Sequence, residues 1–519
     1  MGLSVEVRKN TYYDSVTLML ISKEIKQIMG VNEALVGMGT DLNKELAKNL
    51  NLINEDIKKL GPNDFFIVAN LEDDSVIEKV IKTVDNLLIK KKSEDSSEYR
   101  PATLDSALKY QSDSNLVLIS VPGKYASDEV KKALKNDKHV MLFSDNVSIE
   151  EEIELKKLAK EKGLLMMGPD CGTAIINNVP LAFANVIKKG NIGIVGASGT
   201  GTQEVSVIID KLGMGVSQVI GTGGRDLKSE VGGIMMLEGI DALLNDKNTE
   251  VIVLISKPPA KEVSEKVLKK VSKSKKPVVV NFIGGDLDLI KKHGAYPSST
   301  LEDAAYKAVA LAKKEEPMDF NGFSLEKEKI EKIVKKEVEQ MDSEQKYLRG
   351  LYTGGTLADE AMKLLTKDLG HIYSNIPLDP QFKLIDVNKS IEHTCLDLGD
   401  DEFTVGRPHP MIDPSTRVER LIKEAKDEEV AVLLMDFVLG YGSHEDPIGE
   451  MIPAIKKAKE SMVKKGKHLS IVASICGTNN DPQSLEISKR KLENEGVIVM
   501  PSNAQAVKLV SEIFKKINS

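Results

Sequence analysis

Short apolar runs of strand length alternate with segments of helical spacing along most of this chain. From residue 115 onward the alternation is regular, and its first apolar runs occupy residues 116–120, 139–143 and 164–167. Strands that alternate with helices indicate parallel sheets joined by right-handed crossovers. The pattern therefore predicts an α/β protein with three doubly wound parallel-sheet units.

The alternation predicts unit boundaries at residues 1–185, 186–315 and 344–519. The strand-like runs of the second and third units are 192–195, 215–220, 251–255, 278–283, 430–435, 470–474 and 497–500. Residues 316–343 are rich in Lys and Glu, which predicts a charged linker with a surface helix. The first unit begins with an N-terminal extension, and the charged, Ser-rich residues 90–101 are predicted to be a solvated loop.

A glycine-rich turn follows the first strand of the second unit, in the sequence GNIGIVGASGTGTQE. It predicts a strand, a tight turn and a helix N-terminus, where unpaired N–H groups favour phosphate or carboxylate. An ordinary turn without a ligand is the alternative interpretation. The candidate anion-binding residues of this turn are Ser198, Gly199, Thr200, Gly201 and Thr202.

Two further glycine segments strengthen the anion hypothesis. GTGGRDL follows the next apolar run, and RGLYTGGTLADEAM in the third unit repeats the order of strand, glycine pair and helix. If the two units faced each other, two helix N-termini would point at one small anionic group. The additional candidates are Gly223, Gly224, Arg225, Gly354, Gly355 and Thr356.

Polar and glycine-containing loops also follow the strands of the first unit, as SVPGKY, SDN and GPDCGT. Ligands of doubly wound sheets bind beyond the carboxyl ends of the strands. Each loop alone is typical of a plain strand-to-helix connection, but together they predict a cleft. Its candidate cofactor-binding residues are Pro122, Gly123, Lys124, Asn146, Pro169 and Cys171.

Composition narrows the classes of function. The chain of 519 residues has a formal net charge of −8 and no Trp, which argues against nucleic acid as the main partner. Its three cysteines are isolated, which suits a reducing cytosol. We find no signal peptide and no apolar stretch near 18 residues, so we expect a cytoplasmic protein without a membrane partner.

Several motifs together resemble a known enzyme family. GPDCGT, GNIGIVGASGTGTQE, GTGGRDL and VLISKPP resemble the α subunit of succinyl-CoA synthetase. RGLYTGGTLADEA, DLGDDEFTVGRPHPMIDP and DFVLGYGSHEDP resemble the carboxyl domain of its β subunit. The fused arrangement closely resembles the FdrA family of acyl-CoA-synthetase-like proteins. The resemblance implies a Rossmann-like CoA-binding-type domain at 1–185, followed by two flavodoxin-like domains of succinyl-CoA-synthetase type.

The resemblance also implies roles for individual residues. The turn at Ser198 would bind the phosphate carried by a histidine, and Glu238 would steady that histidine. His293, in the partial motif KHGA, is the candidate nucleophile, with an ordinary loop histidine as the alternative. A second phosphate-binding helix would begin near Gly440, Gly442 and Ser443.

Two residues near the sequence GRPHP are further candidates. Arg407 has the planar fork that can clamp an anion, and His409 lies between two prolines that restrict the backbone. The alternative is that the prolines build only a rigid turn. Asp400 and Asp401 are weak evidence for a metal, because a lone carboxylate pair has too few ligands, and we expect no metal site.

The resemblance leaves three functions open. The first is an acyl-CoA-synthetase-like enzyme that handles an acyl phosphate or phosphoryl group, with CoA as cofactor. The second is a carbamoyltransferase component that acts on carbamoyl phosphate in oxamate and ureide (allantoin or purine) catabolism. The third is a non-catalytic scaffold subunit. The three predicted units leave no room for an ATP-grasp domain, so nucleotide binding stays open, and we expect a homo- or hetero-oligomer with separate partner subunits.

Overall fold

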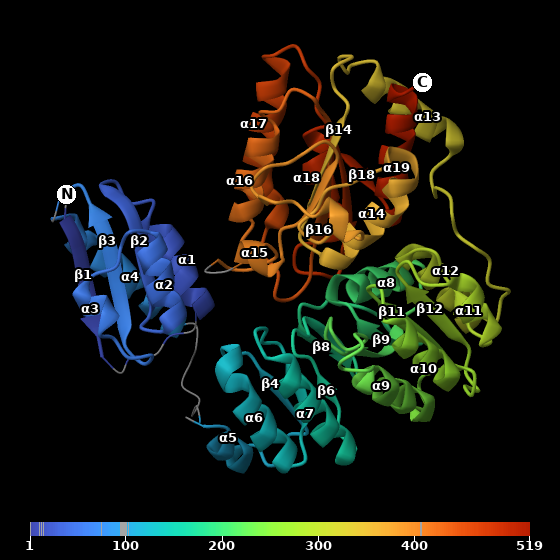
Figure 1. Cartoon of the computed structure of the whole chain (residues 1–519), viewed down its shortest axis with the longest axis horizontal. Coiled ribbons are helices and arrows are strands. Elements are labelled where there is room, and N and C mark those ends of the chain that lie inside the picture. The colour runs from blue at the N-terminus through green and yellow to red at the C-terminus, as the bar shows by residue number, and fades with distance from the viewer. Residues whose placement is uncertain are drawn as a thin grey trace. The chain divides into compact units, whose positions relative to one another are not determined.

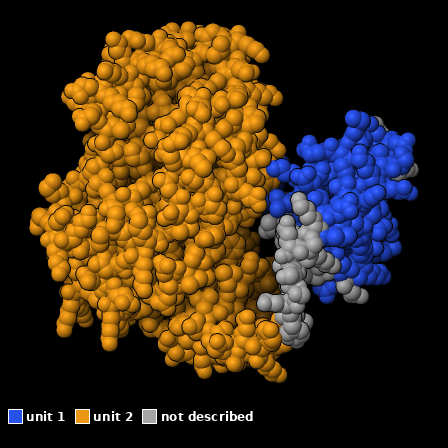
Figure 2. Space-filling model, turned by 180° about the vertical axis from the view of Figure 1, so that it is seen from behind, with its two compact units in different colours: residues 1–100, 403–408 blue, residues 101–402, 409–519 orange. Residues whose placement is uncertain are grey.

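The computed structural model describes residues 2–9, 11, 13, 15–73, 75–93, 101, 103–404 and 407–519 (Figure 1). The chain divides into two compact units, coloured separately in Figure 2. The first unit comprises residues 1–100 and 403–408, and the second comprises residues 101–402 and 409–519. Among the described residues, no helix is long and apolar enough to cross a membrane.

The first unit is a three-stranded antiparallel sheet covered by helices on both faces. Its strands β1 (Gly2–Arg8), β2 (Val31–Met38) and β3 (Phe65–Leu71) lie in the order β1-β3-β2. Phe65 and Ile67 face a core with Leu18, whereas Phe66 and Val68 face a second core, because successive strand residues point to opposite faces. The helices are α1 (Ser15–Ile25), α2 (Asp41–Asn49), α3 (Glu55–Lys58) and α4 (Val76–Ser93).

This unit corrects two predictions. Residues 2–93 do not extend a parallel sheet that reaches residue 185, because β3 lies between β1 and β2 and pairs antiparallel with both. Alternation of strands and helices in sequence does not specify strand direction, which here depends on where the short helices α2 and α3 return the chain. Residues 90–93 belong to α4 and not to a loop, and residues 94–100 of the predicted loop lie outside the described residues.

The second compact unit (residues 101–402 and 409–519) begins with a parallel sheet, as predicted for residues 116–167. Strands β4 (Leu116–Ile119), β5 (His139–Leu142) and β6 (Met166–Met167) lie in that order and are all parallel. Its helices are α5 (Leu104–Tyr110), α6 (Gly123–Lys135) and α7 (Ile149–Glu161). Ser148 caps α7 in a capping box with Glu151, which explains why this acidic helix begins there.

A seven-stranded sheet follows, in the order β13-β12-β11-β9-β10-β7-β8. Its strands are β7 (Thr173–Ile176), β8 (Val179–Ala182), β9 (Lys189–Ala197), β10 (Val216–Gly221), β11 (Val251–Ser256), β12 (Val278–Phe282) and β13 (Tyr296–Pro297). Five strands are parallel, and the β7–β8 hairpin adds an antiparallel edge. Since this hairpin precedes residue 185, the sheet begins before the predicted boundary. The helices are α8 (Gly199–Lys211), α9 (Ile234–Asn245), α10 (Lys261–Val271), α11 (Leu287–Lys292) and α12 (Leu301–Ala312).

The C-terminal sheet is parallel throughout, in the order β15-β14-β16-β17-β18. Its strands are β14 (Tyr347–Tyr352), β15 (Thr394–Asp397), β16 (Val430–Val438), β17 (Ser470–Cys476) and β18 (Ile498–Met500). All nine residues of β16 are buried, as expected for a central strand covered on both faces. Its helices are α13 (Lys327–Val338), α14 (Gly355–Leu369), α15 (Asp401–Thr404), α16 (Ser415–Glu424), α17 (Pro447–Val463), α18 (Leu485–Asn494) and α19 (Asn503–Ile517), with a short 3-10 turn at Pro380–Phe382.

Helices of the last two sheets share one apolar core. In the C-terminal part, α14 and α19 lie on one side of the strands and α16 and α17 on the other (Figure 1). Val205 of α8, Ala304 of α12, Leu357 of α14 and Val510 of α19 belong to a single buried cluster. The charged segment predicted as a linker joins it too, because Ile330 of α13 is buried there. The seven-stranded and C-terminal sheets are therefore packed together through their helices.

Buried carboxyl groups cross this shared core. Glu360 accepts hydrogen bonds from the Leu301 backbone N–H (2.7 Å) and from Nδ2 of Asn503 (2.8 Å). Glu204 accepts from the Asn503 backbone N–H at 3.0 Å. Burial, together with nearby Glu204 and Glu302, raises the pKa of Glu360 to about 7, against the hydrogen bonds from Leu301 and Asn503. Glu360 therefore holds a proton more readily in the folded chain than in the unfolded chain.

We predict that Glu360→Gln removes part of the pH dependence of stability. A raised folded pKa means that the stabilising proton is bound at pH 5 and is lost as pH rises through 7, so the wild type weakens towards pH 8. The glutamine side chain of the variant cannot titrate. The free energy of unfolding of the variant relative to the wild type should therefore increase from pH 5 to pH 8, by on the order of 3 kcal/mol at most. Thermal unfolding of both proteins at pH 5 and pH 8 measures this difference. A constant difference in Tm between the two pH values would contradict the prediction.

Candidate functional site

Loops from the carboxyl ends of several parallel strands meet in the second unit. A narrow cavity lies among the loops that follow β6, β9 and β10, and it encloses about 10 Å³, roughly the space of one water molecule. Its lining residues are Asp170, Cys171, Gly172, Thr173, Gly196, Ser198, Gly199, Gly221 and Gly223. The first glycine turn and GTGGRDL are thus brought together, at the sheet edge where ligands of such folds bind.

Ser198 organises the first glycine turn. It is the N-cap of α8, with an extended backbone, and its Oγ accepts a hydrogen bond from the Gly201 N–H at 3.0 Å. The same hydroxyl donates to Oγ1 of Thr356, the second residue of α14, at 2.7 Å. Gly199 and Thr200 occupy the first helical positions, where N–H groups have no intrahelical acceptor. The N-termini of α8 and α14 therefore touch through two side chains.

The second glycine turn is held from within by Asp436 of β16. This carboxylate accepts from the backbone N–H groups of Thr353 (2.8 Å) and Gly354 (3.0 Å). It also accepts from the Thr353 hydroxyl at 2.8 Å, and Arg417 lies 3.5 Å away. A Cβ on Gly354 would lie 2.6 Å from Oγ1 of Thr200, so only glycine allows the two turns to approach this closely. The backbone N–H groups of Thr353 and Gly354 therefore already donate to Asp436 and are not available to a ligand.

Lys257 lies beside these turns; the motif VLISKPP contains it, but it was not among the candidate site residues. It directly follows β11, and because Ser256 pairs with Ala197, it leaves the sheet level with Ser198. Its Nζ is 3.8 Å from Oδ2 of Asp359, and its side chain keeps 38% of its surface exposed. A Cβ on Gly355 would lie 2.7 Å from this Nζ. A lysine that follows the apolar run 251–255 after a single serine is the sequence signal that could have identified it.

Carboxyl groups surround the Lys257 ammonium. Burial lowers the pKa of Lys257, but Asp359, Asp397, Asp170 and Asp400 outweigh burial and raise it overall, so the ammonium keeps its charge. Asp397, the last residue of β15, is buried, and burial raises its pKa to about 7 despite the opposing effect of Lys257. The site thus contains a fixed cation and a carboxyl group that titrates near neutral pH.

The two candidate histidines lie at different distances from this site: His293 is remote from it, and His409 lies next to Gly399 beside the second glycine turn. His293 is the C-cap of α11, and its Nδ1 lies 2.9 Å from the carbonyl oxygen of Leu289. Because α11 runs back to the start of β13, His293 lies near the edge where strands begin, opposite the glycine turns. His409 accepts a hydrogen bond from the Met411 N–H, and burial lowers its pKa to about 4, so it is neutral at pH 7.

Glu238 and Arg225 have structural partners elsewhere. Glu238 of α9 pairs with Lys160 of α7 at 2.9 Å and does not line the cavity. Arg225 pairs with Glu152 at 2.9 Å and donates to the Val147 carbonyl at 2.8 Å. Its guanidinium therefore ties the GTGGRDL turn to α7 and the loop before it. Gly223 packs against the Pro169 carbonyl with a φ of +84°, which favours glycine, and Gly224 follows it in the same turn.

The N-terminus of the predicted second phosphate-binding helix is capped by a carboxylate of the protein itself. Helix α17 begins at Pro447 and is capped by Asp446, which accepts from the Gly449 N–H at 2.9 Å and pairs with Lys491. Gly440 donates to Gln483, and the following residue donates to the Ala184 carbonyl. Gly442 and Ser443 belong to this same loop, which packs on residues 182–185. This carboxylate already satisfies the positive end of the helix and would repel a second anion there.

Arg407 belongs to the first unit, whereas the glycine turns belong to the second. It is exposed, and its backbone N–H donates to the Thr404 carbonyl at 3.1 Å. The geometry of the anion site is therefore built from the second unit alone.

The candidate cofactor loops lie at the carboxyl edge of the β4–β6 sheet. Gly123 begins α6 and packs against the backbone of Asn146, where a Cβ would clash. Pro122 and Lys124 are exposed, and α6 has no side-chain cap. Cys171 is buried, and burial raises the pKa of its thiol to about 12, so it is not a nucleophile.

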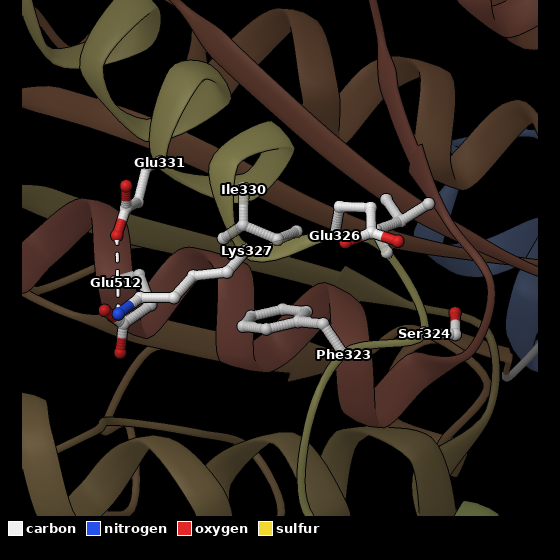
Figure 3. A pocket seen from close by; sticks show the side chains of 8 residues that line it. Phe323, Ser324, Glu326, Lys327, Ile330, Glu331 and Glu512 are labelled. Atoms are coloured by element: carbon white, nitrogen blue, oxygen red, sulfur yellow. Dashed lines mark ion pairs between the residues drawn. The ribbon is translucent and has the colours of Figure 1, made fainter.

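A larger surface groove lies away from these loops. It has a volume of about 600 Å³ and is formed by residues 323–331 together with Glu512 of α19 (Figure 3). Figure 3 shows Lys327 directed at Glu331 and Glu512, and Glu326 adds a third carboxylate. Its excess of negative charge makes it unsuitable for phosphate.

Three family models match separate parts of the chain. Residues 1–103 match a model described as AllF, heavy metal-associated domain, residues 187–284 match the CoA binding domain, and residues 351–513 match CoA-ligase. The CoA binding match thus falls in the predicted second unit and not in residues 1–185. Residues 1–103 contain neither His nor Cys, and no cluster of metal-binding side chains occurs in the described ranges. These residues therefore do not fit a thiophilic metal.

The chain is also similar to whole proteins. It is 47% identical to the uncharacterized protein YahF of Escherichia coli over 99% of both chains. It is 28% identical to the succinate–CoA ligase α subunit 2 of Archaeoglobus fulgidus, over 34% of this chain and 60% of that subunit. The solved structure of PH0766 from Pyrococcus horikoshii has 15% identity and a TM-score of 0.32 over 78% of this chain and 84% of that chain. The chain spans about 60% of the ligase subunit that it matches.

We predict that Gly355→Ala destabilises the second unit, whereas Gly199→Ala does not. Both glycines occupy the first position of a helix, but a Cβ at Gly355 would force Lys257 and Asp397 apart, whereas one at Gly199 meets only Oγ1 of Thr173 at 3.7 Å. The expected loss for Gly355→Ala is about 1–3 kcal/mol. Urea unfolding of the two variants measures it, and equal midpoints would contradict the described packing.

Proposed function

Since the chain belongs to the FdrA family of acyl-CoA-synthetase-like proteins, we propose that it is an enzyme that uses an acyl phosphate. The phosphate group binds at the N-terminus of α8, between the first glycine turn and Lys257. The observation that carries this proposal is the 2.7 Å hydrogen bond between Ser198 and Thr356. It brings two helix N-termini to one place, beside a lysine that retains its charge.

The proposed reaction is a direct acyl transfer. The acceptor attacks the acyl carbon and gives its proton to the departing phosphate. The bond between that carbon and the bridging phosphate oxygen breaks, and inorganic phosphate leaves. Negative charge grows on the leaving phosphate, where the N–H groups of Gly199 and Thr200 and the Lys257 ammonium stabilise it. No phosphohistidine is needed, which agrees with the place of His293 at the opposite sheet edge.

The first candidate for the acceptor is CoA, which supplies a thiol when bound. Two features of the β4–β6 edge suit its phosphate groups: α6 has no side-chain cap, and Lys124 is exposed at its second position. Pro122 and Asn146 border the same loops. The match of residues 187–284 to the CoA binding domain supports CoA as the acceptor, although those residues lie outside the β4–β6 sheet.

Carbamoyl transfer is the second candidate. Carbamoyl phosphate already contains an activated acyl group, so neither a nucleotide nor a phosphorylated histidine is required. The separate position of His293 favours such a direct route. In this form the chain works with partner subunits that supply the acceptor, as the FdrA resemblance implies.

We predict that inorganic phosphate binds to the full chain and that Gly199→Val weakens binding by about tenfold or more, equivalent to about 1.4 kcal/mol. A β-branched side chain at Gly199 would occupy the cavity beside Thr173. Calorimetric titration measures the affinity. Gly322→Val is the matched control, because a Cβ at Gly322 meets no atom within 4 Å.

His293→Asn should leave both phosphate binding and turnover of acetyl or carbamoyl phosphate unchanged, because its ring faces Leu289. Absence of phosphate binding in the wild type would overturn the proposed function. An acid-labile phosphoenzyme that disappears in His293→Asn would instead restore a histidine relay and refute direct transfer.

A further inference from the structure

Positive charge is concentrated where the two glycine turns meet. Helices α8 and α14 each direct an N-terminus there, equivalent to about half a unit charge apiece, and Lys257 adds a full charge. Burial opposes this concentration, so it requires negative partners. Asp359 supplies one, 3.8 Å from the Lys257 ammonium. Asp397 supplies the other, since a Cβ on Gly355 would contact its Oδ2 and the Lys257 Nζ together.

Asp397 is enclosed by groups from every neighbouring element. Lys257 at the end of β11 favours its charge, whereas Asp359 on α14 and Asp400 in the following loop oppose it. Tyr352, its partner in β14, is fully buried, and burial raises the pKa of its hydroxyl well above the usual value, so it is neutral. Oδ1 of Asp397 accepts from the Gly399 N–H at 3.0 Å, next to the neutral ring of His409.

An unpartnered hydroxyl supports an anion at this place. Oγ1 of Thr173 is buried and has no hydrogen-bond partner among the described residues. It lines the same cavity as Ser198 and lies 3.7 Å from where a Gly199 Cβ would be. A buried hydroxyl without a partner is unfavourable, and an anion at the α8 N-terminus would accept its hydrogen bond.

We propose that the site binds a phosphate dianion together with a proton, and that Asp397 is the group that takes up this proton. The proposal rests on the proposed function and adds its pH control. A dianion beside Lys257 brings negative charge close to Asp397, and like charges in a buried place favour protonation of one of them. Without the anion, Lys257 instead stabilises the ionised form of Asp397. Anion binding therefore raises the proton affinity of Asp397.

Proton uptake makes the affinity of the site for the anion fall as pH rises. Below the pKa of Asp397 in the free protein, about 7, the proton is already bound and affinity is constant. Above it, each bound anion must bring about one proton, so affinity falls by about tenfold per pH unit. A site that used only Lys257 and the helix N-termini would show no such slope in this range.

Sulfate is the suitable probe, because it is a tetrahedral dianion that does not titrate near neutral pH. We predict that titration calorimetry of the full chain at pH 8, in two buffers with different ionisation enthalpies, gives an uptake of close to one proton per sulfate. At pH 6 the uptake should fall towards zero. Asp397→Asn should bind sulfate with pH-independent affinity and no uptake.

Glu360→Gln is the matched control. Glu360 is also buried with a pKa raised to about 7, but its hydrogen bonds go to Leu301 and Asn503. Uptake must therefore survive in Glu360→Gln. Asp170→Asn is the second test, because Asp170 lines the cavity and burial raises its pKa to about 6. Uptake at pH 8 must survive in that variant, and its loss there would assign the proton to Asp170 and overturn the coupling even if Asp397→Asn does not fold.

The outcomes separate the two proposals. If neither phosphate nor sulfate binds to the wild type, the proposed function fails together with the coupling. If the anions bind without proton uptake at pH 8, or if uptake persists in Asp397→Asn, the coupling is wrong and the anion site stands. Uptake that is lost in Asp397→Asn and kept in Glu360→Gln supports the coupling.

Discussion

The contact between the N-termini of α8 and α14 is the constraint on which the polar interior of the second unit depends. The Ser198–Thr356 hydrogen bond joins two helix ends of the same positive sign, which would repel each other in an apolar interior. Negative groups must therefore be close. Asp436 meets the turn before α14 through three hydrogen bonds, and Asp359 and Asp397 lie beside Lys257. The acidic residues are therefore the counterpart of the positive helix ends and of Lys257.

Other buried hydrogen bonds fix the position of the seven-stranded sheet and its helices relative to the C-terminal sheet. Asn185 donates to the Leu439 carbonyl and to Asp481, and it accepts from Gln203 of α8. Asn503 of α19 is held in the same way by Glu204 and Glu360. Such networks stabilise only one arrangement, because a shift would leave several buried groups without partners. The geometry at the glycine turns is consequently set by hydrogen bonds on both sides of it, and the apolar core supplies the bulk of the burial.

Much of the fold and part of the site could be predicted from the sequence. Apolar runs located most parallel strands of the second unit but missed β7, β8, β13 and β15, and the repeated glycine pattern identified the two turns that the structure brings together. Lys257 and Asp397 were missed, although the motifs VLISKPP and DLGDDEFTVGRPHPMIDP contain them, because their proximity depends on packing between two sheets. The ion pairs of Glu238 with Lys160 and of Arg225 with Glu152 could not be predicted, because the sequence around a charged residue does not identify its partner. The first unit was misread because strand direction is not encoded in alternation.

By itself, the sequence determined the local features, because periodicity, glycine turns and helix caps depend on neighbours within a few residues. It specified where α8 and α14 begin and that each begins after a tight turn. Only the tertiary structure decided that these two ends touch, that Lys257 stands beside them and that His293 faces the other sheet edge. Those facts depend on strand order and on the packing of α8 and α12 against α14 and α19, which link residues more than a hundred positions apart.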